Sequence, residues 1–278
     1  MFKASHSKRL IFRERRFDHL KMKQCFNPRL SCQELRENDV HIWSISFSDV
    51  LTHIQEFYKT LDSTERIRAG RYHLPKERAR FIGCRGMLRS LLGNYLKIDA
   101  AQVNFSYGLH GKPLLKNTCG EKRLHFNLAY SNDLILAAFT LDSEIGVDLE
   151  YVEEIPELNW AINTFFSENE CAVFQTLPVS QWTDAFYHCW TRKEAFIKAI
   201  GNDRIFPSTT FDVSFAPGEP AQLLQIAGNS EEPSHWEIQS LTPALNYVGA
   251  IAVRRPNCRM KVYNEWMQQY SDNYKLIA

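Results

Sequence analysis

The stretch SQWTDAFYHCWTRKEAFIKAIG, residues 180–201, determines how the chain is interpreted. Its apolar side chains recur every three or four residues, which predicts a long helix that Gly201 can close in the left-handed conformation. Trp190, Glu194 and Lys198 follow one another at intervals of four and share one stripe of that helix. Charged groups on the stripe of a tryptophan would be partly buried, and buried charges need a partner or a task. The alternative interpretation is that Glu194 and Lys198 form an ordinary i,i+4 salt bridge on the helix surface.

A second long helix is predicted upstream, at residues 75–96, where proline occupies a first-turn position. Alternating and short apolar runs predict strands around both helices. The expected strands are residues 40–47, 103–107, 124–128, 134–141, 145–150, 211–215, 236–241 and 247–254, and the expected shorter helices are residues 49–61, 63–72, 158–166 and 167–177. Both halves of the chain therefore run strand, helices, strands.

This order predicts an α+β fold of two pseudo-symmetric halves, each a small, mostly antiparallel sheet packed on a long helix, with the active site between the halves. The expected boundaries are a basic N-terminal leader at 1–38, an N-terminal half at 39–141 and a C-terminal half at 142–278. The leader is interpreted as poorly ordered, with a transit peptide as the alternative. Segment 216–234 is rich in turn residues and is expected to be a surface loop.

The formal net charge of +1 conceals an uneven distribution, because residues 1–30 hold nine Lys or Arg against two acids. The rest of the chain has an excess of acids, so a nucleic-acid partner is not expected. No uncharged apolar run approaches the ~18 residues of a transmembrane helix, so no membrane partner is expected either. Seven cysteines without a CxxC pair indicate reduced thiols and a cytoplasmic protein.

Residues 146–150, GVDLE, place two acids on one face of a predicted strand. Asp148 and Glu150 would lie side by side there, and two such carboxylates repel unless a cation lies between them. Paired oxygen ligands of this kind suit Mg²⁺. Taken alone, two ordinary acids at a solvent-facing strand end explain the motif as well.

Two shorter motifs precede this strand. Residues 111–113, GKP, form a rigid turn that presents Lys112. Residues 125–132, HFNLAYSN, run from a strand into a polar turn whose amides and hydroxyls suit a phosphate. Each pattern is common in loops, so neither predicts a function by itself.

In this order and spacing the motifs GKP, F-N-L-x-x-S, G-V-D-L-E and W-x-x-K-E-A-F-x-K-x-x-G resemble the 4′-phosphopantetheinyl transferases of the two-domain surfactin-synthetase-activating (Sfp) type. The resemblance covers roughly residues 40–255. It implies an Mg²⁺-dependent enzyme that binds coenzyme A between its two halves. Such an enzyme moves the 4′-phosphopantetheine arm onto a serine of an apo acyl or peptidyl carrier protein and releases 3′,5′-ADP. The two-half architecture further suggests a monomer.

The resemblance also implies roles for single residues. Asp148, Glu150 and Glu194 are expected to hold the metal, and Lys198 is expected to contact the pyrophosphate. Glu194 is the expected base for the serine proton, with a metal-bound water as the alternative. The further residues expected to contact coenzyme A are Arg80, Lys112, Pro113, Asn127, Tyr130, Ser131 and Lys193. Arg78 competes for the role of Arg80, and a bracing role is the alternative for Lys193.

One departure from the family pattern bears on substrate affinity. Many relatives have Ser-His-Ser where this chain has Ala129, Tyr130 and Ser131, and the family uses that Ser-His pair on coenzyme A phosphates. This puts the strength of phosphate binding in doubt rather than the type of reaction. A catalytically impaired coenzyme-A-binding protein is therefore the alternative function, although the retained acids and Lys198 argue against it. By analogy, the carrier protein is expected to dock near residues 159–177.

Overall fold

The computed structural model describes residues 34–108, 111–201 and 207–264. Nearly all of the expected leader at 1–38 lies outside these residues. The described elements belong to one compact unit. Within that part of the chain, every helix is too short or too polar to cross a membrane.

The observed elements confirm the mixed α+β class. The strands are β1 (Asp39–Ser46), β2 (Phe105–Tyr107), β3 (Pro113–Leu115), β4 (Leu124–Ser131), β5 (Leu134–Leu141), β6 (Ile145–Tyr151), β7 (Phe211–Val213), β8 (Leu223–Ile226), β9 (Glu237–Leu241), β10 (Tyr247–Val253) and β11 (Arg259–Tyr263). The α-helices are α1 (Phe47–Thr52), α2 (Ile54–Thr60), α3 (Ser63–Gly70), α4 (Pro75–Leu96), α5 (Leu158–Phe165), α6 (Glu168–Thr176) and α7 (Trp182–Ile200).

Two sheets form the centre of the fold. The first has the strand order β11-β1-β5-β4, and the second has the order β6-β10-β9. All pairings inside them are antiparallel except that of β1 with β11, which is parallel. The last described strand therefore returns across the expected boundary at 142 and extends the sheet of the first half.

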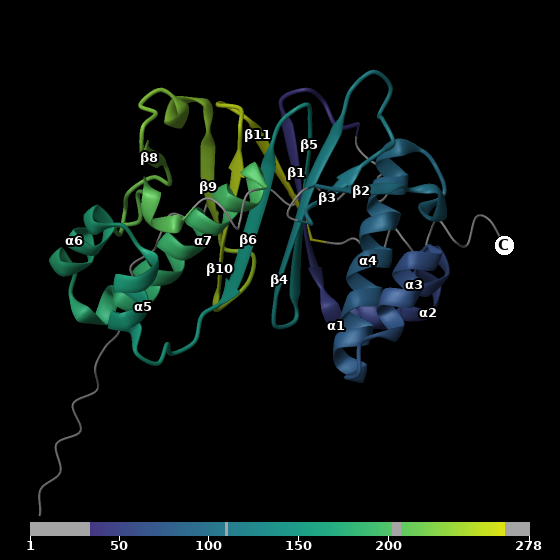
Figure 1. Ribbon diagram of the computed structural model, residues 1–278, viewed down its shortest axis with the longest axis horizontal. Helices are drawn as coiled ribbons and strands as arrows, with labels where there is room; N and C mark the ends of the chain where they lie inside the picture. The colour runs from purple at the N-terminus through teal and green to yellow at the C-terminus, as the bar shows by residue number, and fades with distance from the viewer. Residues whose placement is uncertain (1–33, 109–110, 202–206, 265–278) are drawn as a thin grey trace, which may run out of the picture. The chain divides into compact units, whose positions relative to one another are not determined.

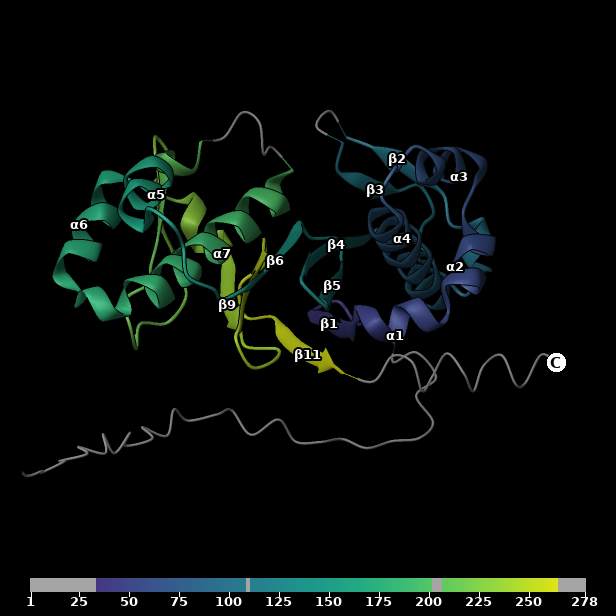
Figure 2. The ribbon, with the colours of Figure 1, turned by 90° about the horizontal axis from the view of Figure 1, so that it is seen from below.

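The two sheets face each other, and each is covered by a long helix on its outer side (Figures 1 and 2). Alternation along the strands produces this arrangement, because successive side chains point to opposite faces. One core lies between α4 and the first sheet, one between the two sheets, and one between the second sheet and α7. The middle core joins Val40, Ile42, Leu136 and Ala138 of the first sheet to Val147, Leu149, Ile251 and Val253 of the second.

Several elements differ from the sequence-based expectation. The helix expected at 49–61 begins earlier, at Phe47, and is interrupted at His53; the amide of Ser48 in its first turn donates to the distant Asp133 side chain. The strand expected at 103–107 begins only at Phe105. Segment 216–234, expected to be a loop, contains β8. Strands β3, β8 and β11 were not expected, because three to five residues are too few to show a period of two.

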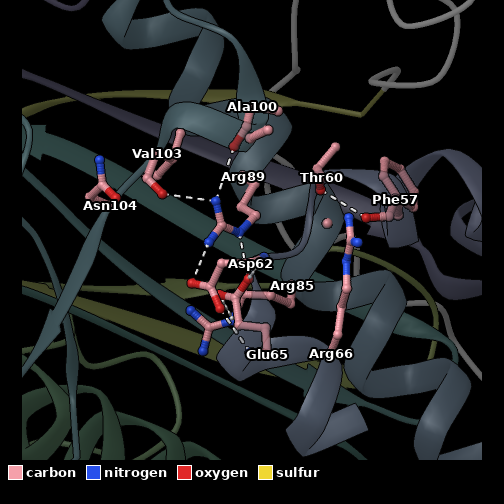
Figure 3. A network of polar contacts seen from close by, with 12 residues as sticks. Phe57, Thr60, Asp62, Glu65, Arg66, Arg85, Arg89, Ala100, Val103 and Asn104 are labelled. Atoms are coloured by element: carbon pink, nitrogen blue, oxygen red, sulfur yellow. Dashed lines mark hydrogen bonds and ion pairs between the residues drawn. The ribbon is translucent and has the colours of Figure 1, made fainter. Parts of the chain in front are cut away.

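A buried arginine fastens α3 and the segment that precedes β2 to α4 (Figure 3). Arg89 donates to Glu65 at 2.7 Å, to Asp62 at 3.0 Å and to the Val103 carbonyl at 2.8 Å. Asp62 also caps α3, since its side chain accepts from the Glu65 amide. A buried guanidinium that is fully hydrogen-bonded fixes the relative position of the segments it joins. The network therefore sets where α3 and α4 present their other arginines.

Candidate active site

Strand β6 carries the two predicted acids on the face that it turns towards α7. Asp148 is buried with 4% of its surface exposed, and Glu150 is half-buried. Val147 and Leu149, which alternate with them, pack into the core between the sheets. The expected alternation is therefore present, but the acids lie at the contact with α7 rather than at a solvent-facing strand end.

Helix α7 brings its charged stripe to these acids. The Lys198 ammonium lies 2.5 Å from Asp148 Oδ1. Glu194 precedes Lys198 by one helical turn and is half-buried on the same stripe. Gly201 ends the helix with a φ of +66°, as its position in the sequence predicts. Strand β6 and helix α7 thus present all three predicted metal ligands, Asp148, Glu150 and Glu194, and the predicted catalytic residue Lys198 on the surfaces that face each other.

Gly146 makes this contact possible. A Cβ at this position would overlap the Ala195 carbonyl oxygen and the Ala199 amide nitrogen of α7. The absent side chain therefore lets strand and helix backbones touch. Because Asp148 and Glu150 share the face of Gly146, the same approach sets how far they lie from Lys198.

The electrostatics of the acid pair suit a cation. Burial and the neighbouring Asp148 raise the pKa of Glu150, against the opposing effects of Ser131, Lys198 and Trp190. Asp148 Oδ2 is buried and has no hydrogen-bond partner among the described residues. A buried, uncovered carboxylate oxygen beside a second carboxylate is a donor set that Mg²⁺ fits. In the described part of the chain, however, no three His, Cys, Asp or Glu side chains are gathered as a metal cluster.

Asn127 and Ser131 connect β4 to β6. Asn127 Oδ1 accepts from the Val147 amide at 2.9 Å, and Ser131 Oγ accepts from the Tyr151 amide at 3.0 Å. The Ser131 hydroxyl also lies 3.3 Å from Glu150 Oε2. Both strands are sheet edges, and these side chains satisfy amides that an edge leaves unpaired. Asn127 and Ser131 therefore both bind β6 in this structure, and their expected contacts with coenzyme A stay a prediction.

Tyr130 points to the opposite face of β4, where a cavity of about 470 Å³ lies against α3 and α4. The Arg80 guanidinium lies 5.1 Å from the centre of the Tyr130 ring and donates to the Asn132 carbonyl at 3.1 Å. The residues that line the cavity are Arg68, Tyr72, Glu77, Arg80, Phe81, Cys84, Arg85, Leu88, Pro113, Phe126, Asn127, Leu128 and Tyr130. Arg78 is exposed and is not among them.

The structure therefore brings four of the expected coenzyme A contacts to one cavity, namely Arg80, Pro113, Asn127 and Tyr130. It adds two arginines that sequence reasoning missed. Arg68 comes from α3, and Arg85 lies one turn before Arg89 on α4. Arg85 pairs with Glu65 at 3.4 Å, while its buried Nη1 has no hydrogen-bond partner among the described residues. The sequence could not single out Arg85, because the same helix carries three further arginines, Arg78, Arg80 and Arg89.

Lys112 lies elsewhere. Its ammonium donates to the carbonyl oxygens of Lys198 at 2.5 Å, Ala199 at 2.8 Å and Ile145 at 3.3 Å. Burial lowers the pKa of this lysine to about 8, against the opposing effect of Glu144. The ammonium of Lys112, which was expected to contact coenzyme A, thus lies at the C-terminus of α7.

Lys193 is also directed away from the acid pair. It is buried with 1% of its surface exposed, and its ammonium binds both oxygens of Glu170 at 2.7 and 2.6 Å and the Phe211 carbonyl at 2.5 Å. Glu170 in turn accepts from the Val213 amide at 2.9 Å. The expected contact of Lys193 with coenzyme A does not fit this placement, whereas the bracing role does. The ion pair joins α6, α7 and β7.

Comparison with known proteins agrees with the four motifs. Residues 144–252 match the 4′-phosphopantetheinyl transferase superfamily, and residues 43–141 match the family described as 4′-phosphopantetheinyl transferase, N-terminal. The chain is 36% identical to the 4′-phosphopantetheinyl transferase HetI of Nostoc sp. over 79% of its own length and 89% of that protein. It is 29% identical to the 4′-phosphopantetheinyl transferase Sfp of Bacillus subtilis over 73% of its length and 86% of that protein.

The chain therefore belongs to the 4′-phosphopantetheinyl transferase superfamily, a family of transferases. The resemblance seen in the sequence is confirmed.

Proposed function

We propose that this protein transfers the 4′-phosphopantetheine arm of coenzyme A to a serine of an apo acyl or peptidyl carrier protein, with Mg²⁺ as cofactor and 3′,5′-ADP as the second product. Two observations support the proposal: the ion pair of Asp148 with Lys198, with Glu150 on the same face of β6, and a cavity against α3 and α4 that is lined by arginines. Transfer of a phosphoryl group needs charge neutralisation and positioning more than covalent chemistry from the protein.

The acid pair is the metal site of this proposal. Asp148 and Glu150 supply carboxylate oxygens, of which the buried Asp148 Oδ2 lacks a partner among the described residues. Glu194 is proposed as the third ligand because it lies on the α7 stripe that faces them. Mg²⁺ bound there would neutralise the charge of the pyrophosphate.

The cavity beside α4 is the proposed site for the nucleotide end of coenzyme A. Arg68, Arg80 and Arg85 offer positive charge to its phosphate, while Tyr130 and Pro113 offer apolar surface. The Lys198 side chain, about 31% exposed, is proposed to turn from Asp148 to the pyrophosphate. Glu194 is proposed to take the serine proton, with a metal-bound water as the alternative base.

The carrier protein is proposed to dock on α5 and α6. Trp160 on α5 is 60% exposed, and its ring packs edge-on against Phe165. An exposed aromatic side chain held in place by a second ring is a typical anchor of a protein interface. We further propose that the protein acts as a monomer in the cytoplasm, and the five free cysteines described suit a reducing compartment.

The experiment that tests the function combines purified protein, coenzyme A, Mg²⁺ and a panel of apo carrier proteins, followed by intact mass. We expect the carrier serine to gain the mass of phosphopantetheine, and EDTA to abolish the gain. Glu194→Gln should abolish it as well, whereas Glu121→Gln, at an exposed acid in the turn before β4, should leave it unchanged. Binding of coenzyme A without a mass gain on any carrier would favour the catalytically impaired coenzyme-A-binding protein instead.

A further inference from the structure

The ammonium of Lys112 closes the end of the helix that carries Glu194 and Lys198. The last four carbonyls of an α-helix have no partner within the helix, and a cation there also meets the negative end of the helix dipole. Lys112 donates to two of these carbonyls, those of Lys198 and Ala199, at 2.5 and 2.8 Å. A side chain from the β2–β3 hairpin of the first half therefore completes a helix of the second half.

The same ammonium also binds the strand that carries the acids. Its third hydrogen bond, at 3.3 Å, goes to the carbonyl of Ile145, the first residue of β6. An ammonium has three donors, so all three are directed at carbonyl oxygens of β6 and α7.

Gly201 makes room for this lysine. A Cβ at Gly201 would lie 3.2 Å from Lys112 Cδ, and the φ of +66° at this residue favours glycine. The lysine stem therefore packs closely against the residue that terminates α7. Lys112 is held both by its hydrogen bonds and by this contact. In the observed position its ammonium therefore has no donor left for a phosphate or another anion.

We propose that Lys112 is a positioning residue of the transferase rather than a ligand of coenzyme A. It fixes the end of α7 against the start of β6, and it thereby holds Lys198 at its distance from Asp148. Loss of the ammonium would free the last turn of α7 and lower the rate of transfer, while the affinity for coenzyme A would remain. The kinetic part of this inference rests on the proposed function, whereas the structural part does not.

Lys112→Met tests the proposal, because methionine keeps most of the aliphatic stem and removes the donors. Lys116→Met is the matched control, since Lys116 follows β3 directly and is exposed. Hydrogen exchange of the α7 amides at 195–201 is measured first, in the ligand-free protein. We expect exchange there to become at least tenfold faster in Lys112→Met and to stay unchanged in Lys116→Met.

Calorimetry and kinetics form the second arm. We expect kcat for carrier modification to fall at least tenfold in Lys112→Met, with Kd and KM for coenzyme A within about twofold of the wild type. The ratio of Kd values for 3′-dephospho-coenzyme A and coenzyme A should not change either. Unchanged hydrogen exchange would overturn the proposal, and so would a Kd for coenzyme A that rises tenfold while Kd for the dephospho analogue does not. Absence of transfer by the wild-type protein would overturn the proposed function and leave the exchange result to decide the role of Lys112.

Discussion

Asp148 and Lys198 form an ion pair, with 2.5 Å between Oδ1 and Nζ, that joins β6 to α7. The two partners differ in environment, because the Asp148 side chain is 5% exposed and the Lys198 side chain 31%. A buried carboxylate gains much from an adjacent cation, whereas the more exposed ammonium can reach an incoming anion. This pair is therefore the contact at which the resting protein and the proposed substrate complex are expected to differ most.

Lys198→Met should lower the rate of carrier modification by roughly 100-fold, because the pyrophosphate loses a positive partner. It should also lower the free energy of unfolding by about 2 kcal/mol, since the buried Asp148 keeps its charge without a partner. Intact mass of the carrier and urea denaturation measure the two effects. The double variant Asp148→Asn with Lys198→Met should regain most of the stability and none of the activity. A double variant as unstable as Lys198→Met would contradict this explanation.

Tyr130→His should lower KM for coenzyme A by about threefold. This is a smaller effect than a tenfold change in affinity, which corresponds to ~1.4 kcal/mol of binding free energy. The imidazole would lie beside Arg80 at the cavity and could add a charge-assisted hydrogen bond to a phosphate. Steady-state kinetics at several coenzyme A concentrations measure the effect. Tyr107→His, a matched change at an exposed tyrosine of β2, should leave KM unchanged. An unchanged or raised KM in Tyr130→His would show that this side chain does not contact the substrate.

Gly146→Ala should destabilise the protein by about 3 kcal/mol, because its Cβ would overlap backbone atoms of α7. The control is Gly70→Ala, at a helical position where a Cβ would meet nothing within 4 Å. Alanine has the higher helix propensity, so this control should be neutral or stabilising by a few tenths of a kcal/mol. Urea denaturation compares the two variants. Equal losses of stability would show that the contact of β6 with α7 does not depend on Gly146.

Asp39→Asn should make the free energy of unfolding depend less on pH between pH 7 and pH 3. Burial raises the pKa of Asp39, but the hydrogen bond and charge of Lys261 and the charge of Arg259 on β11 outweigh it, so the net pKa is lowered. A carboxyl with a lowered pKa contributes stability above its unfolded value of 3.8, and this contribution is lost as the pH falls through the folded value. We therefore expect Asp39→Asn to cost about 2 kcal/mol at pH 7 and less at pH 3.

Urea midpoints of the wild type and of Asp39→Asn at both pH values measure this difference. The control is Asp49→Asn, at an exposed acid of α1, which should cost little at either pH. A difference between wild type and Asp39→Asn that stays constant or grows towards pH 3 would contradict the assignment.

The two long helices show what could be predicted from the sequence. Helix α4 spans Pro75–Leu96, as predicted, because a first-turn proline marks its start and the apolar pattern continues to its end. Helix α7 ends before Gly201 for an equally local reason. The strand β11 could not be predicted, since its pairing with β1 depends on residues more than 200 positions away and its five residues show little alternation.

The candidate site likewise has one part that could be predicted from the sequence and one part that could not. The positions of Asp148 and Glu150 on one strand face, and of Glu194 and Lys198 on one helix stripe, follow from the periods of strand and helix. The sequence also identified the family, because four motifs in a fixed order are far more specific than any one of them. These features are properties of short segments, so they can be predicted without knowing how the segments pack in the fold.

Only the tertiary structure decided what the polar residues outside those segments bind. On β4, the packing of the first sheet directs Tyr130 to Arg80 and the cavity, and Ser131 to Glu150. Lys112 binds the end of α7, and Lys193 binds Glu170, although both lysines belong to motifs that define the family. A motif specifies which groups are present, but the partner of each group is set by which segments pack beside it, and such contacts join residues far apart in the sequence.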